Sequence, residues 1–184
     1  DGQSWDDSVK SLVATPSVSG DEVAIVSLLS SFLQGHGATV ESIGGSLLAW
    51  AGKAPVKGDV EGVPLVVMNT HVDTVPPSPG WTRAPHQASS AEGKVFGLGA
   101  NDAKASVAAM LHAARDVADA GGPRHGRLLV VLGFGEETKH TSMLSRRLVA
   151  FTEHRGASAL APSHDLVRSA VLKGLVDVES HHLA

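Results

Sequence analysis

Two short, continuous apolar runs constrain the fold of this chain most strongly. They occupy residues 65–68 and 128–134, are rich in valine and leucine, and are bounded by glycine, proline or polar residues. Runs of this length and composition are typical of strands buried on both faces of a parallel sheet. Between them, residues 102–120 are rich in alanine, methionine and leucine and follow Asn101, a suitable N-cap, which predicts a strong helix. This alternation predicts a layered α/β domain with a mostly parallel sheet.

The rest of the chain gives weaker predictions of the same kind. Apolar residues at helical spacing predict a helix over residues 6–14 and a second one from residue 23 to the glycines at 35–37. The Gly44-Gly45 pair separates two extended runs, as expected of a turn between strands. Strands are predicted over residues 39–43, 46–51, 95–96, 157–161 and 167–172, and a further helix over residues 141–151.

Size and composition narrow the class of protein. A length of 184 residues fits one domain, so we treat residues 1–184 as a single domain with its own core. The net charge of −4 disfavours nucleic acid as a partner, and no apolar run approaches the ~20 residues of a membrane-spanning helix. The absence of cysteine excludes disulfides, thiolate zinc sites and cysteine nucleophiles, whereas ten histidines raise the question of a metal site.

Residues that can carry out chemistry follow the two apolar runs. His71 and Asp73 come soon after the first run, and Glu136 and Glu137 come just after the second. If the two strands are parallel neighbours, their carboxyl ends meet at one rim of the sheet, where ligands bind in such folds. Asp102 stands at the start of the predicted helix and can reach the same rim.

This set of imidazole and carboxylate groups suits Zn²⁺ and related divalent ions. The His-x-Asp spacing can place the carboxylate of Asp73 against the second ring nitrogen of His71, which would orient a metal-bound imidazole. Adjacent Glu136 and Glu137 would repel each other unless a cation binds, and then one can hold the metal while the other accepts a proton from water. Taken singly, each feature is more typical of a surface ion pair, a solvated turn or a charge at a helix N-terminus. Only their combination predicts a metal site.

Three motifs carry a resemblance to a known family. They are MNTHVDTVP at residues 68–76, GKVFGLGANDAK at residues 93–104 and GEET at residues 135–138. Together, in this order and spacing, they resemble the zinc-dependent M20 metallopeptidase and deacylase family over residues 9–138. The resemblance implies a three-layer αβα domain with a mostly parallel central sheet, like that of zinc peptidases. It also implies that the family's lid domain and the C-terminal half of its catalytic domain are missing from this chain.

The same resemblance implies a role for each residue at the rim. His71 would bind one metal ion, and Asp73 would support it as a catalytic residue. Asp102 would bridge two metal ions, and Glu137 would bind the second. Glu136 would be the catalytic general base and acid in the attack of water on an amide bond. The implied cofactors are two divalent metal ions, zinc by preference, with cobalt and manganese as alternatives.

The sequence NDAKAS at residues 101–106 looks most like the acetylornithine deacetylase branch of that family. It implies removal of the acyl group from an N-acyl amino acid such as N-acetylornithine, in amino-acid biosynthesis and in the cytoplasm. The partner would be a small N-acyl amino acid or short peptide, and neither a nucleic acid nor a membrane. A homodimer is expected if the full protein has the lid domain. A di-zinc aminopeptidase or a carboxypeptidase-type peptidase is the alternative.

The chain departs from the family pattern after residue 138. Ala161 stands before Pro162-Ser163, where the family has a glutamate ligand. His181 and His182 follow Lys173-Gly174 too closely to replace the family's last histidine ligand, and we expect them to be a terminal pair without that role. We therefore expect the amino-terminal portion of a longer enzyme. A catalytically incomplete relic of the same fold is a further alternative.

Overall fold

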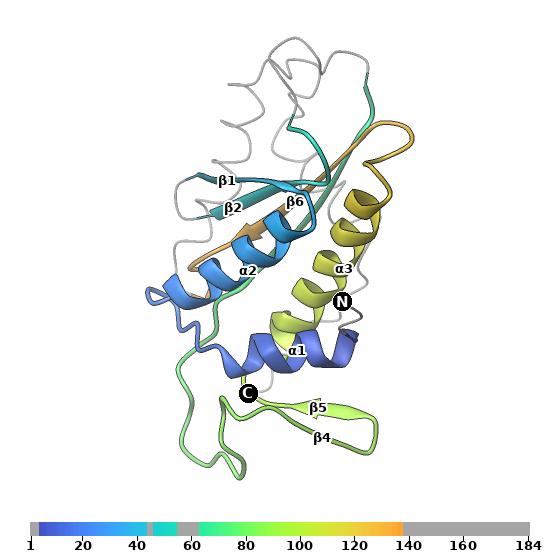
Figure 1. Cartoon of the computed structure of the whole chain (residues 1–184). Helices are drawn as coiled ribbons and strands as arrows, with labels where there is room; N and C mark the ends of the chain where they lie inside the picture. Colours follow the sequence, from blue (N-terminus) through green and yellow to red (C-terminus); the bar gives the residue numbers. More distant parts are fainter. Residues whose placement is uncertain (1–3, 44–45, 55–62, 138–184) are drawn as a thin grey trace.

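The structure, a computed structural model, describes residues 4–43, 46–54 and 63–137. A mixed four-stranded sheet has the strand order β1-β2-β6-β3, and three helices lie together over one of its faces (Figure 1). The strands are β1 (Thr39–Ile43), β2 (Ser46–Trp50), β3 (Leu65–His71) and β6 (Arg127–Gly133). The helices are α1 (Trp5–Ala14), α2 (Val23–Gly35) and α3 (Ala105–Asp119).

The pairing of β3 with β6 positions the candidate site. These strands are parallel neighbours, and His71 at the end of β3 lies opposite Gly133 at the end of β6. The α/β class and the parallel pairing of the two apolar runs are thereby confirmed. The other two pairings of the described sheet, β1 with β2 and β2 with β6, are antiparallel. Only two residues separate β1 from β2, which is too few for the crossover that a parallel pair requires.

The core lies on both faces of the central strands β2 and β6. Because side chains alternate along a strand, each strand contributes to two clusters. One cluster packs under the helices and includes Leu47, Ala49, Val130 and Leu132. The other, on the opposite face, consists of Leu48, Trp50, Leu129 and Val131, each at most 4% exposed. The prediction that the second apolar run is a strand buried on both faces is confirmed.

The same prediction for the first apolar run is wrong. Strand β3 is only partly buried along its length, and Val66 is 53% exposed. Within the described residues β3 pairs only with β6 and so lies at the edge of the sheet. A continuous apolar run shows that a segment is β-forming, but the number of neighbouring strands decides how deeply it is buried.

Helix α3 begins three residues later than predicted. An irregular turn, η1 (Ala100–Lys104), precedes it, and Asp102 within that turn is extended, with φ −121° and ψ 96°. Lys104 is the N-cap of α3, so the prediction of Asn101 as N-cap and Asp102 as the first helical residue is wrong. The local sequence favours a helix from Asn101, but the chain forms this turn instead, and Lys104 at its end donates hydrogen bonds to α1.

The other predicted helices and the predicted strand at residues 95–96 are present in the structure. The helices predicted over residues 6–14 and from residue 23 are confirmed as α1 and α2, with Ser4 accepting a hydrogen bond from the backbone N–H of Asp7 at the start of α1. The strand predicted at residues 95–96 is β5 (Lys94–Phe96), which forms a hairpin with β4 (Ser89–Ala91). Glu92 and Gly93 connect them with positive φ at both positions, as a tight hairpin turn requires.

Several predictions fall outside the described residues. They are the turn at Gly44-Gly45, the helix at 141–151, the strands at 157–161 and 167–172, and the proposed departures at Ala161, His181 and His182. Among the described helices, none combines the length and the apolar character needed to cross a membrane.

Candidate metal centre

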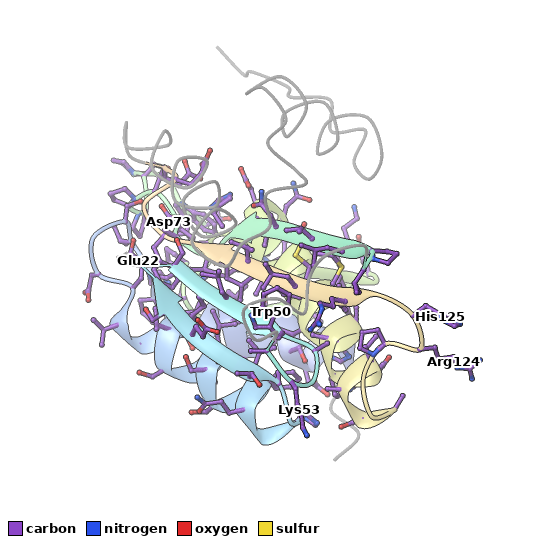
Figure 2. All side chains as sticks on the ribbon, turned by 90° about the horizontal axis from the view of Figure 1, so that it is seen from above. Glu22, Trp50, Lys53, Asp73, Arg124 and His125 are labelled. Atoms are coloured by element: carbon purple, nitrogen blue, oxygen red, sulfur yellow. The ribbon has the colours of Figure 1, made fainter. Side chains whose placement is uncertain are left out.

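The candidate residues gather at the rim where β3 and β6 end. The ladder continues one step past β3, because the N–H of Val72 donates to the carbonyl oxygen of Gly133 at 3.0 Å. Asp73 follows directly, and Glu136 and Glu137 come three and four residues after the end of β6. Asp73 lies at one end of the molecule, and Arg124 and His125 lie at the opposite end (Figure 2). The parallel register therefore brings together residues more than sixty positions apart.

Asp73 is the most buried group of the site. Its side chain is fully buried, and Ser19 donates a hydrogen bond from Oγ to Oδ2 at 2.6 Å. The backbone N–H of Glu136 donates to Oδ1 at 3.1 Å, and that of Glu137 donates to Oδ2 at 3.0 Å. Burial raises the pKa of Asp73, but His71, Ser19 and the two N–H groups outweigh it and hold that pKa well below its usual range. Asp73 is therefore ionised at every ordinary pH.

His71 faces carboxylates through both ring nitrogens. Nδ1 lies 3.2 Å from the backbone oxygen of Asp73 and 3.5 Å from its Oδ1, so the predicted contact of ring and carboxylate is present but the carbonyl is closer. Nε2 lies 3.0 Å from Oδ1 of Asp102. Burial lowers the pKa of His71, but Asp73, Asp102 and Glu136 together raise it to about 9. Nδ1 is thus engaged by the protein, and Nε2 points to the carboxylate side of the rim.

Asp102 reaches His71 from a different element. Its side chain is 75% exposed, and His71 is the partner it contacts in the described part of the chain. Since nothing else there holds its carboxylate, the backbone of η1 sets the position of Asp102.

The remaining acidic groups complete a cluster that suits a cation. His71, Glu136 and Glu137 each offer one ligand atom, and these three atoms lie within 4.8 Å of one another. The pKa of Glu137 is raised by burial and by the negative charges of Asp102, Glu136 and Asp73, against the opposing effect of His71. No Lys or Arg in residues 4–43, 46–54 and 63–137 forms an ion pair with any of these groups. The described residues therefore leave part of the cluster's negative charge without an ion-pair partner.

The donor set fits a divalent metal ion. Zinc ligands stand about 2.0–2.2 Å from the ion, so two ligands of one ion lie roughly 3–4 Å apart. The 3.0 Å between His71 and Asp102 falls in that range, and the other donors are within reach of the same space. Nitrogen and carboxylate oxygen are ligands that zinc and related ions accept. A cation would also relieve the repulsion among the carboxylates.

Sequence reasoning missed two residues beside this site, Ser19, which is half-buried, and Lys104. Ser19, which holds Asp73, lies 54 residues before it, in a segment that runs alongside the end of β3 through a bridge between Val18 and Thr74. Lys104, which is fully buried, comes two residues after Asp102. The apolar pattern carries no signal for either contact, because both depend on segments far apart in the chain.

Comparison with known proteins supports this description. The family model for Peptidase family M20/M25/M40 matches residues 67–174. A succinyl-diaminopimelate desuccinylase of Bordetella parapertussis is 35% identical over 135 residues, which cover 71% of this chain and 34% of that protein. An N-acetyl-L-citrulline deacetylase of Xanthomonas campestris pv. campestris is 46% identical over 55 residues, 30% of this chain and 15% of that protein.

A solved structure shows the same fold. Human carnosine dipeptidase 1 aligns with a TM-score of 0.64 and 24% identity, covering 82% of this chain and 35% of that one. The chain spans about a third of the length of the desuccinylase it matches.

Proposed function

Since the chain belongs to peptidase family M20/M25/M40, we propose that the whole protein is a metal-dependent amidohydrolase that removes the acyl group from an N-acyl amino acid. One observation carries the proposal. His71, Asp102, Glu136 and Glu137 come from three separate segments and converge at the rim where β3 and β6 end, with more negative charge than the described residues neutralise. Such convergence is expected of a metal centre.

The residues proposed to hold the metal are His71, Asp102 and Glu137. His71 offers Nε2, since its Nδ1 faces Asp73, and Asp102 lies close enough to His71 to share a ligand sphere with it. We propose that these three residues would hold two divalent ions, zinc by preference. When bound, the ions would polarise the acyl carbonyl and lower the pKa of water at the site. Asp73 acts on this centre by fixing the ring of His71 and the backbone of both glutamates.

Glu136 is the proposed general base and acid. Its side chain is exposed at the rim, while its backbone N–H is fixed by Asp73 at 3.1 Å. The Glu136 carboxylate takes a proton from the water that attacks the acyl carbon, and a carbon–oxygen bond forms. It then gives that proton to the nitrogen as the carbon–nitrogen bond breaks, which yields a carboxylic acid and a free amine.

The proposed substrate class rests on two of the similar proteins, the desuccinylase and the deacetylase. Both the desuccinylase and the deacetylase are named for removing an acyl group from the nitrogen of an amino acid. The dipeptidase, at 24% identity, supports the fold alone. N-acetylornithine stays a specific candidate within this class. The cytoplasmic location and the homodimer stay predictions that depend on the same family relationship.

A substrate panel tests the proposal. The full-length protein, loaded with Zn²⁺, would be offered N-acetylornithine, N-succinyl-diaminopimelate, N-acetylcitrulline and a dipeptide with a free amine, and amine release would be measured. We expect turnover of at least one N-acyl amino acid and its loss after chelation. Turnover of the dipeptide alone would replace the deacylase with a peptidase. Zinc binding without any turnover would indicate the catalytically incomplete relic.

A further inference from the structure

Lys104 is a buried cation for which the proposed reaction has no use. It is the largest fully buried side chain of the described residues, with 0% exposure. In the described part of the chain no carboxylate forms an ion pair with it. Burying an ammonium group is costly unless its hydrogen bonds are satisfied. A lysine in this setting, two residues from a proposed metal ligand, requires an explanation.

Its partners are carbonyl groups at the end of α1. Nζ donates to the carbonyl oxygen of Leu12 and to that of Thr15, both at 2.9 Å. The last carbonyls of a helix lack partners within the helix and carry partial negative charge, which favours a cation there. The Lys104 ammonium thus caps the C-terminus of α1 from the start of α3, and Figure 1 shows α1 crossing below the start of α3.

The segment after α1 is fastened in turn to the end of β3. Ser17, two residues beyond Thr15, donates from Oγ to the carbonyl oxygen of Val72 at 2.8 Å. The N–H of Thr74 donates to the carbonyl oxygen of Ser17 at 2.9 Å, and the N–H of Ser19 donates to that of Thr74 at 3.2 Å. Val72 adjoins His71. A short series of hydrogen bonds therefore runs from Lys104 through the end of α1 to the strand that carries His71.

The other side of Lys104 is built into the turn that carries Asp102. Its backbone N–H donates to the carbonyl oxygen of Gly99 at 2.9 Å and closes η1. A Cβ atom on Gly99 would lie 3.4 Å from Cδ of Lys104 and 2.6 Å from Cγ2 of Thr74, so the turn is packed tightly between the two. Among the residues that the structure describes, the Asp102 carboxylate contacts His71 alone, so its place depends on this backbone.

We propose that Lys104 is a positioning residue that sets Asp102 against His71. It does not touch the substrate or the metal. It connects the turn that carries Asp102 to the end of α1 and, through it, to residues 17–19. The same segment holds the strand that carries His71. The 3.0 Å between His71 Nε2 and Asp102 Oδ1 is the distance that this tie fixes. This role rests on the proposed metal centre, and Lys104 holds Asp102 against His71 in the metal-free chain as well.

The test compares Lys104→Met with two control variants. Methionine keeps most of the buried volume and removes the three donors. Leu111→Ala, in the buried face of α3, destabilises the same helix and removes none of the hydrogen bonds between Lys104 and α1. Lys94→Met removes an exposed lysine from β5 and controls for net charge. Should Lys104→Met not fold, Lys104→Gln, whose amide retains two donors on a shorter stem, takes its place.

Two measurements on these variants separate positioning from stability. In the metal-free chain, nuclear Overhauser contacts between the His71 ring and the Asp102 methylene should be lost in Lys104→Met and kept in both controls. In calorimetric titration with Zn²⁺, the affinity of Lys104→Met should fall by about tenfold or more, as for loss of groups that orient metal ligands. The controls should bind as the unaltered chain does.

The Overhauser contacts distinguish a positioning role of Lys104 from a general effect on stability. Retention of the His71–Asp102 contacts in Lys104→Met would overturn the proposal, and so would an equal loss in Leu111→Ala, because stability alone would then explain it. If the unaltered chain binds no zinc, the metal centre of the proposed function fails, and the Overhauser contacts still decide the role of Lys104.

Discussion

The carboxylate of Asp73 accepts a hydrogen bond from the backbone N–H of Glu137 at 3.0 Å, across 64 positions of sequence. It accepts a second from the N–H of Glu136, so one buried side chain joins the end of β3 to the turn after β6. The family resemblance gives Asp73 the task of supporting His71. The geometry adds a second task, because Asp73 also fixes the backbone from which both glutamates extend.

Replacing Asp73 with asparagine tests this double role. In asparagine an NH₂ group, which cannot accept a hydrogen bond, replaces one of the two oxygens of Asp73. One of the backbone N–H groups that donate to Asp73 therefore loses its acceptor. We expect Asp73→Asn to lower the free energy of unfolding by about 1–3 kcal/mol. Urea denaturation of the metal-free chain measures this. Asp116→Asn, which alters an exposed carboxylate paired with Arg115, should change it little. Similar losses in both variants would contradict the role of Asp73.

The raised pKa of His71 predicts how stability changes with pH. The pKa of His71 is about 9 in the folded chain, against an ordinary value of 6.5. A raised folded-state pKa contributes stability that is fully present below pH 6.5 and is lost as the pH rises towards 9. Without metal, we expect the chain to lose about 3 kcal/mol of stability over this interval through His71.

Thermal unfolding in chelator-treated buffers from pH 6 to 9.5 checks this expectation. In His71→Gln the decline of Tm over the interval should be much shallower, because the residue that loses its proton is gone. Zinc affinity should change in the opposite direction and rise with pH, since a metal binds the neutral imidazole. Parallel Tm profiles for the unaltered chain and His71→Gln would show that His71 does not titrate as described.

The proposed roles of the two glutamates predict different results for Glu136 and Glu137. Glu136→Gln should abolish hydrolysis by the full-length protein while zinc affinity stays within about threefold, because in the proposed mechanism Glu136 moves a proton and is not a ligand. Glu137→Gln and His71→Ala should each weaken zinc binding by about tenfold or more. Calorimetry and an amine-release assay on the same preparations give both quantities. Unchanged turnover in Glu136→Gln would remove the assigned general base.

Gly99 predicts a steric effect on the Asp102 turn. Gly99 has a φ of +74°, and an added Cβ would lie 2.6 Å from Cγ2 of the buried Thr74. Gly20, with a φ of +96° and open space around it, is the matched control. We expect Gly20→Ala to cost about 1 kcal/mol through its backbone conformation alone. Gly99→Ala should cost about 1–3 kcal/mol more through overpacking and should also weaken zinc binding.

Denaturation and calorimetry of the two glycine variants provide the comparison. Equal losses of stability, with zinc affinity unaffected, would mean that the turn moves freely around Thr74 and that its packing does not set the position of Asp102.

Strand β6 and helix α1 illustrate what could be predicted from the chain alone. The continuous apolar run of β6 predicted a strand buried on both faces, and it is one. The helical spacing of Val9, Leu12 and Val13 predicted α1, and these residues are buried. Such predictions succeed because the periodicity of side chains along an element is a local property.

Helix α3 and strand β3 illustrate the opposite case. Asn101 has the chemistry of an N-cap, yet the contacts of Lys104 with Leu12 and Thr15 accompany a turn that delays the helix to Ala105. Val66 is a residue type that is typical of buried strands, yet β3 has one neighbouring strand in the described sheet and Val66 is exposed. In both cases the deciding partner lies far away in the sequence.

The amino-acid sequence by itself determined which residue types stand at the ends of the two apolar strands, and hence that carboxylates and an imidazole meet at one rim. That follows from the fixed direction of parallel strands. Only the tertiary structure decided how these groups are held: Ser19 and two backbone N–H groups on Asp73, and Lys104 on the end of α1. Hydrogen bonds between distant segments form only where packing of the core brings those segments within 3 Å or so, and no local pattern records that distance.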